Sequence, residues 1–171
     1  ASAAGYMNPN RIAPEHLPLF VRHNRRFYHE CDMTMSPMVL DWDQPTDAVK
    51  DAFRQFSPDG YATIVMDLHQ TGGHLPEPHV WKGMPVMELI NEACNFAGVE
   101  QTAEIMSRAM DARGIRKPGF YFFRIVWTEP SKIIATLDTL RAKRPDLDIE
   151  VLDPYTFFAT FRAHQEAPHA P

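Results

Sequence analysis

Polar side chains follow four apolar segments of this sequence, and their types suit acid and base chemistry. Asp41 and Asp43 follow the first segment, and Asp67 follows the second. Cleavage of a glycosidic bond needs a pair of carboxyl groups, one as the acid and the other as the base or nucleophile. We therefore take Asp41, Asp43 and Asp67 as the candidate catalytic residues.

A second group of side chains near the same segment ends suits binding of a polar substrate. Arg124 stands inside an aromatic segment, and a buried guanidinium needs an anionic partner, for which Asp41 or Asp67 is the natural choice. The indole faces of Trp42 and Trp81 can stack on a sugar ring, with core packing as the alternative for both. The candidate substrate-binding residues are Tyr6, Trp42, His69, His74, Trp81, Arg124, Trp127, Glu129 and Asp153.

Structural roles compete with these assignments. An aspartate after a strand often caps a helix or forms an Asx turn, and Asp153, directly before Pro154, has that pattern. The three candidate catalytic aspartates are open to the same alternative. Arg124 suits a structural ion pair as well as it suits substrate binding.

A long segment at residues 68–84 is rich in Gly, Pro and His, and it contains His69 and His74. Histidine and carboxylate side chains could hold a metal, but their spacing here matches no metal motif. The sequence also lacks the phosphate-loop, dinucleotide-binding and serine-hydrolase signatures. We therefore predict no metal and no cofactor, and we interpret the segment as a loop that lines the substrate site.

The apolar pattern predicts the elements that would bring these residues together. It indicates helices at residues 14–31, 45–56, 85–96, 101–112, 128–143 and 155–164, and strands at residues 38–40, 61–66, 119–127 and 149–152. Alternating strands and helices are typical of an α/β fold, with parallel strands and helical crossovers. Sites in such folds form at the carboxyl ends of the strands, where the candidate residues stand.

Composition narrows the class of protein. The chain has 171 residues, 44% of them hydrophobic and 23% charged, with a net charge of -5. These values predict a single domain at residues 1–164, followed by a flexible tail at 165–171. The mild acidity argues against a nucleic-acid partner, and the absence of a long apolar run argues against a membrane span. Cys31 and Cys94 form no metal or disulfide pattern, so we expect buried free thiols.

Three stretches of the chain carry a family resemblance. The first, Ala3-Ala4-Gly5-Tyr6-Met7-Asn8-Pro9, resembles a G-x-G-Y-x-Y-P signature, with Ala3 in place of the first Gly and Asn8 in place of the second Tyr. The other two, residues 120–127 and residues 150–158, look like the carboxyl-terminal region of the family named after that signature. This family is classed with the glycoside hydrolases, and the three stretches bracket nearly the whole chain.

The resemblance implies a (β/α)-barrel-type catalytic domain in a carbohydrate-processing, often exported, bacterial protein. A carbohydrate substrate and a secreted or periplasmic location follow from it. A full barrel needs about 250 residues, so this chain would be the carboxyl-terminal part of a TIM-like barrel. The remaining barrel portion would then belong to a longer chain. No catalytic residues are carried over from the family.

The resulting prediction is a glycoside hydrolase domain that cleaves glycosidic bonds by carboxylate acid/base chemistry. Two alternatives stay open. One is a non-catalytic carbohydrate-binding or accessory domain that uses Tyr6, Trp42 and Trp81. The other is a small complete α/β domain with flavodoxin-like layering that binds a different ligand.

Overall fold

A computed structural model describes residues 5, 7–41, 44–65, 77–91, 97–115, 118–126 and 128–167. The chain divides into two compact units, the first made of Ala1–Leu89 with Leu152–Pro171 and the second of Ile90–Val151. The fold is of mixed α/β class, with parallel strands and a helical crossover. This much of the predicted fold class is confirmed.

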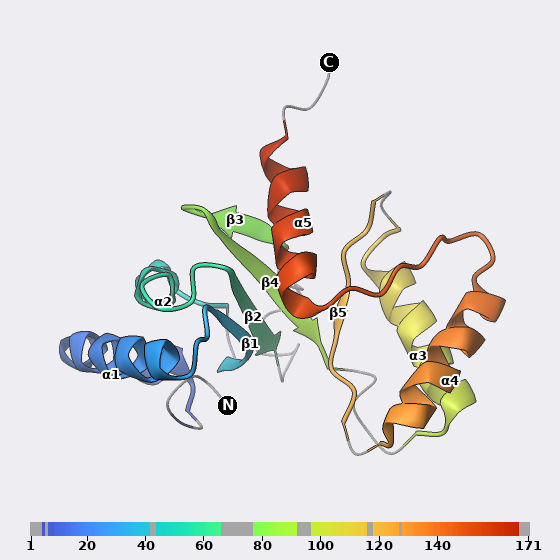
Figure 1. Ribbon diagram of the computed structural model, residues 1–171, viewed down its shortest axis with the longest axis horizontal. Coiled ribbons are helices and arrows are strands. Elements are labelled where there is room, and N and C mark those ends of the chain that lie inside the picture. The colour runs from blue at the N-terminus through green and yellow to red at the C-terminus, as the bar shows by residue number, and fades with distance from the viewer. Residues whose placement is uncertain are drawn as a thin grey trace. The chain divides into compact units, whose positions relative to one another are not determined.

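A mixed sheet forms the centre of the first unit (Figure 1). Four of the five strands of this sheet are β1 (Met35–Asp41), β2 (Gly60–Val65), β3 (His79–Trp81) and β4 (Met84–Ile90), in the order β1-β2-β4-β3. β1, β2 and β4 are parallel, and β3 is antiparallel to β4. Helix α2 (Asp47–Phe53) makes the crossover from β1 to β2.

An irregularity in β1 sets the register of the strand ends. The pairing passes from Ser36 opposite Tyr61 to Val39 opposite Thr63, so β1 contains one residue more than β2 over this stretch. Pro37 lies within this bulge, where its missing N–H is tolerated. Beyond the bulge the two strands run in step, and Asp41 pairs with Val65.

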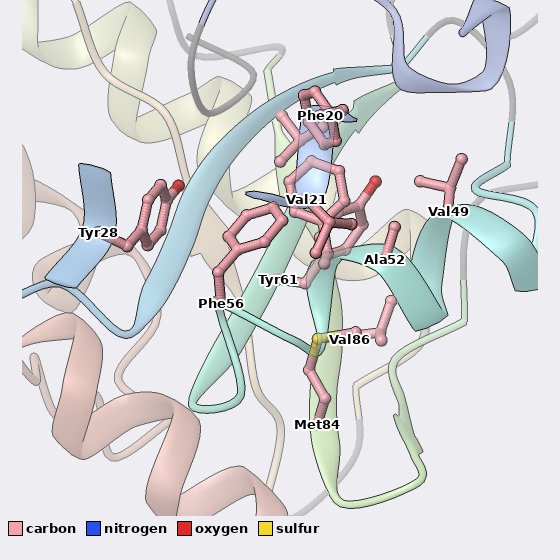
Figure 2. Close-up of a cluster of buried hydrophobic side chains, with 11 residues drawn as sticks. Phe20, Val21, Tyr28, Val49, Ala52, Phe56, Tyr61, Met84 and Val86 are labelled. Atoms are coloured by element: carbon pink, nitrogen blue, oxygen red, sulfur yellow. The ribbon is translucent and has the colours of Figure 1, made fainter. Parts of the chain in front are cut away.

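Helices α1 (Leu17–Glu30) and α2 pack apolar side chains on one face of this sheet. Figure 2 shows side chains of both helices gathered with Tyr61 of β2 and Val86 of β4. The buried positions of α1 recur at helical spacing, which makes one apolar side. Phe20 of α1 and Phe53 of α2 pack together, and the ring of Phe53 lies 4.7 Å from that of Tyr61 in β2. The apolar side chains of both helices thereby bury Tyr61 of β2 and Met84 and Val86 of β4.

Helix α5 (Pro154–Glu166) lies on the opposite face. Gly60 alternates with Tyr61, and a Cβ on Gly60 would lie 2.7 Å from Cγ of the fully buried Phe158 of α5. The first unit is therefore a sheet with helices on both faces. Closure of the strands into a barrel is not seen among the described residues. α5 extends two residues into the predicted tail.

The second unit is built on a helix pair. Helices α3 (Val99–Ala112) and α4 (Pro130–Lys143) pack through Met106, Met110 and Leu140. The short strand β5 (Phe122–Phe123) precedes α4. Arg144 follows α4, and its half-buried guanidinium donates to the carboxylates of Asp146 and Asp111 at 2.9 Å each; the bond to Asp146, and then that to Asp111, raises the pKa of Arg144.

The helix predicted at residues 85–96 is wrong over its described first part, which is strand β4. All seven residues of β4 are buried, so their pattern has no period that separates a strand from a buried helix. The predicted loop up to residue 84 likewise contains β3. Lys82 and Gly83, with φ of 48° and 87°, make a two-residue turn that joins the two strands.

The predicted strands at residues 119–127 and 149–152 also need correction. The first is reduced to β5, and the second is not a strand: Val151 is 56% exposed, while Ile149 packs on the α3–α4 pair. Cys31 is exposed rather than buried, because it lies at the end of α1. The other five predicted helices and the strands at residues 38–40 and 61–66 are confirmed, with small shifts in their bounds.

Candidate functional site

The carboxyl ends of β1 and β2 lie at the same edge of the sheet. Asp41 is the last residue of β1, and it is aligned with Val65, the last residue of β2. Asp43 and Asp67 each follow their strand by two residues. Adjacent strands lie about 4.8 Å apart, so the ends of β1 and β2, at Asp41 and Val65, are direct neighbours.

Several predicted site residues lie partly or wholly outside the described residues. Only the backbone of Asp41 belongs to the described part of the chain. Seven of the predicted site residues are wholly outside the described ranges, and so is Cys94. These seven are Tyr6, Trp42, Asp43, Asp67, His69, His74 and Trp127.

Glu88 is a buried acidic residue that sequence reasoning missed. It is aligned with Thr63 in the neighbouring strand, and these two side chains are 8% and 0% exposed. Both residues alternate with the positions under α5 and so share the face that α1 and α2 cover. The turn at Lys82-Gly83 precedes this strand, but Lys-Gly is not among the residue pairs that usually mark a hairpin turn, so the sequence carried only a weak signal for it.

The hydroxyl of Thr63 has no hydrogen-bond partner among the described residues, although it is fully buried. We expect Thr63→Val to raise the free energy of unfolding by about 1 kcal/mol, because valine has the same shape without the unsatisfied hydroxyl. Urea denaturation measures this. Thr136→Val is the control, since the Thr136 hydroxyl donates to the carbonyl of Lys132 and its loss should bring no gain. A loss of stability in Thr63→Val would contradict the prediction.

Trp81 is held by polar and cationic contacts. Its indole N–H donates to Asp51 at 3.0 Å, and the Lys50 ammonium lies 3.7 Å from the ring centroid. Hydrogen bonds from Lys82 and then Trp81 lower the pKa of Asp51. The ring also packs on the core cluster of the first unit. These contacts support the core-packing alternative for Trp81, since one ring face is already occupied.

Asp153 is the N-cap of α5. Its carboxylate accepts a hydrogen bond from the N–H of Thr156 at 3.1 Å and a second from the Thr156 hydroxyl. These bonds lower the pKa of Asp153, the hydroxyl contributing most. The capping alternative is confirmed. Glu129 occupies the corresponding position before α4, where its exposed side chain makes no capping bond.

Arg124 and Asn91 come together from two strand ends in the second unit. Asn91 directly follows β4, and Arg124 directly follows β5. The Arg124 backbone N–H donates to the carbonyl of Ile90 at 2.8 Å, and its Nη1 donates to Oδ1 of Asn91 at 2.8 Å. The partner is an amide, whereas an aspartate was expected. The half-buried side chain of Arg124 has one atom, Nε, that is buried without a partner in the described structure.

Two cavities lie along α1. The larger, of about 850 Å³, is lined by residues between 7 and 16 and by α1, including Arg11, His23 and Phe27. The smaller, of about 550 Å³, lies between α1 and α2. Among the described residues, no predicted site residue lines either cavity. In the described part of the chain, no group of three or more His, Cys, Asp or Glu side chains is arranged to hold a metal. None of its helices has the length and apolar character for crossing a bilayer.

Comparison with known families supplies the identification. The family described as the GxGYxYP putative glycoside hydrolase C-terminal domain matches residues 1–162. The chain belongs to this family. No curated protein and no solved structure matches it. The resemblance noted at residues 3–9, 120–127 and 150–158 is thus confirmed.

The family description connects this GxGYxYP domain with glycoside hydrolases and names no catalytic residue. Its chemistry must therefore be argued from its own residues. Two arrangements in the GxGYxYP domain bear on its chemistry: the aligned ends of the parallel strands β1 and β2, and the contact between Arg124 and Asn91.

Proposed function

We propose that this GxGYxYP domain acts in the cleavage of glycosidic bonds, with Asp41, Asp43 and Asp67 as the source of the acid and of the base or nucleophile. The parallel register of β1 and β2 is the observation that carries the proposal, because it ends both strands at one edge. Carbohydrate is the substrate, and neither nucleic acid nor membrane is a partner.

The spacing of neighbouring strands suits the two mechanisms of glycosidases. Retaining enzymes hold their carboxyl groups about 5 Å apart, and inverting enzymes hold them about 6.5–9.5 Å apart. The ends of β1 and β2, at Asp41 and Val65, are about one strand spacing of 4.8 Å apart, which is compatible with either separation. Two of Asp41, Asp43 and Asp67 would supply the acid and the base or nucleophile.

The remaining candidates would form the walls of the sugar site. Tyr6, Trp42 and Trp127 offer ring faces for stacking, and His69 and His74 offer hydrogen bonds to hydroxyl groups. The proposal also includes three further candidate substrate-binding residues, Trp81, Glu129 and Asp153. Trp81 is covered by Lys50, and Asp153 is engaged in capping α5.

The proposal extends to a longer, exported bacterial protein in which this chain supplies part of a TIM-like barrel. The parallel strands β1, β2 and β4 with the α2 crossover support it. The position of α5 on the second face supports an open layered sheet, which is the flavodoxin-like alternative. Both architectures form their sites at the carboxyl ends of strands, so the candidate residues are the same.

A glycan panel tests the function. The chain, alone and within the longest natural chain that contains it, is incubated with neutral and acidic oligosaccharides, and newly formed reducing ends are measured. We expect cleavage of at least one substrate, and loss of that cleavage in a folded variant with all three aspartates changed to asparagine. Sugar binding without cleavage would favour the accessory domain, and neither binding nor cleavage would favour the layered domain with another ligand.

A further inference from the structure

We propose that Arg124 and Asn91 form a binding site for the carboxylate of an acidic sugar, so that the substrate is a glycan that contains uronic acid. The inference rests on the proposed function for the sugar, and on the structure around Arg124 for the negative charge. It names a substrate class for the domain.

The charge of Arg124 lacks a counter-charge in the described structure. Its guanidinium is half-buried, its Nη1 bonds the neutral amide of Asn91, and its Nε is buried without a partner. No carboxylate of the described residues forms an ion pair with it. The guanidinium has five N–H donors, and its free terminal donors suit the oxygens of an anion. The position therefore favours a negatively charged ligand.

Arg144 shows how the same unit treats a structural arginine. The Arg144 side chain is 12% exposed, and carboxylates of Asp111 and Asp146 lie 2.9 Å from its two terminal nitrogens. Its charge is thus neutralised twice within the protein. Arg124 is also half-buried, but its hydrogen-bond partner is the neutral amide of Asn91 instead of a carboxylate. The contrast indicates that the anion for Arg124 comes from outside this set of residues.

The guanidinium of Arg124 is also held in place. The hydrogen bond from its backbone N–H to Ile90 fixes the main chain, and the bond to Asn91 fixes one terminal nitrogen. A guanidinium oriented in advance matches the two oxygens of a carboxylate and loses little freedom on binding. Because Nε is buried, the ligand would approach the terminal nitrogens.

Binding of monosaccharides measures this site without any need for cleavage. Isothermal titration or ligand-observed NMR compares glucuronate and galacturonate with glucose and galactose. We expect preference for the acidic sugars and a loss of their affinity by about 10- to 100-fold in Arg124→Met, which is the worth of a charged hydrogen bond. Arg108→Met is the control, because Arg108 lies in the same unit with its side chain 68% exposed. Equal binding by Arg124→Met and the parent chain would overturn the inference.

Asn91→Asp provides a second variant that keeps the shape of the site. The new carboxylate would take the place reserved for the ligand, so we expect weaker uronate binding together with a higher melting temperature. Arg124→Lys keeps the charge but lacks the fork, and it should bind uronate with intermediate affinity. Uronate binding that survives in Asn91→Asp, or a lower melting temperature for that variant, would count against the inference.

The two proposals fail in different ways. Uronate binding that depends on Arg124, with no cleavage of any glycan, would refute the hydrolase proposal and leave the anion site intact. Cleavage of neutral and acidic glycans at equal rates, unchanged in Asn91→Asp, would refute the anion site and leave the hydrolase proposal intact. Sulfated sugars bound in preference to uronates would also refute the carboxylate assignment.

Discussion

Asp67→Asn is expected to lower the rate of glycan cleavage by about 100- to 10,000-fold, which is the usual contribution of a general acid or base. Asparagine has the same size as aspartate but can neither take up nor release the proton. The same loss is expected for whichever of Asp41→Asn and Asp43→Asn removes the second carboxylate. Initial rates at saturating glycan, measured across pH, should lose one limb of the bell-shaped profile in each inactive variant.

The leaving group separates the two roles. An aryl glycoside with a good leaving group needs little protonation, so the variant without the acid should still cleave it. The variant without the base or nucleophile should fail on every substrate. Asp47→Asn is the matched control, since Asp47 lies close by in the sequence but its side chain is 74% exposed on α2 and pairs with Lys50. Rates within about twofold of the parent for all three site variants would refute the assignment, given that acid/base loss is far larger.

Local signals explain why most of the helices could be predicted. The start of α2 is marked by Thr46, whose hydroxyl accepts from the N–H of Val49. The start of α5 is marked by Asp153 and Pro154 in the same way. Capping bonds join residues two or three positions apart, so the sequence contains both partners within one turn.

Strand β4 could not be predicted, because the apolar pattern of its own residues does not distinguish a strand from a buried helix. Neighbours on both faces bury every residue of β4, including Glu88. The turn before it uses Lys82 at positive φ, and lysine is not one of the residues that usually mark such turns. Only the pairing with β2 and β3, which joins distant parts of the chain, distinguishes this segment from a helix.

The same error limited the candidate site. Parallel strands end at one edge, which is a general property of the fold, so carboxylates after β1 and β2 could be selected from the sequence. Asn91 belonged to the segment assigned to a helix, and so it was not considered as a partner for Arg124. The strand ends that the sequence predicts carry only aspartates as partners for Arg124. The neutral partner in the structure is what turns Arg124 into an anion-binding candidate.

Phe158→Ala is expected to lower the free energy of unfolding by about 3–5 kcal/mol, because it removes a fully buried ring between α5 and the sheet. Gly60→Ala acts on the same contact from the other side. Its Cβ would lie 2.7 Å from Cγ of Phe158, so the ring must shift, at a cost of about 1–3 kcal/mol. Denaturation by urea measures both changes. Gly98→Ala is the control without a clash, since a Cβ on Gly98 meets no atom within 4 Å. Because Gly98 is the N-cap of α3, where alanine is less favourable than glycine, its expected cost is about 0.5–1 kcal/mol.

The double variant decides whether α5 covers this face of the sheet in solution. If Gly60 and Phe158 are in contact, the alanine at position 60 clashes with nothing once the ring is gone, and it fills part of the cavity. The double variant should then be less destabilised than the sum of the two single variants. Purely additive effects would mean that α5 does not lie against Gly60. The face would then be free to form the interior of a barrel, so this cycle tests the layered sheet against the barrel.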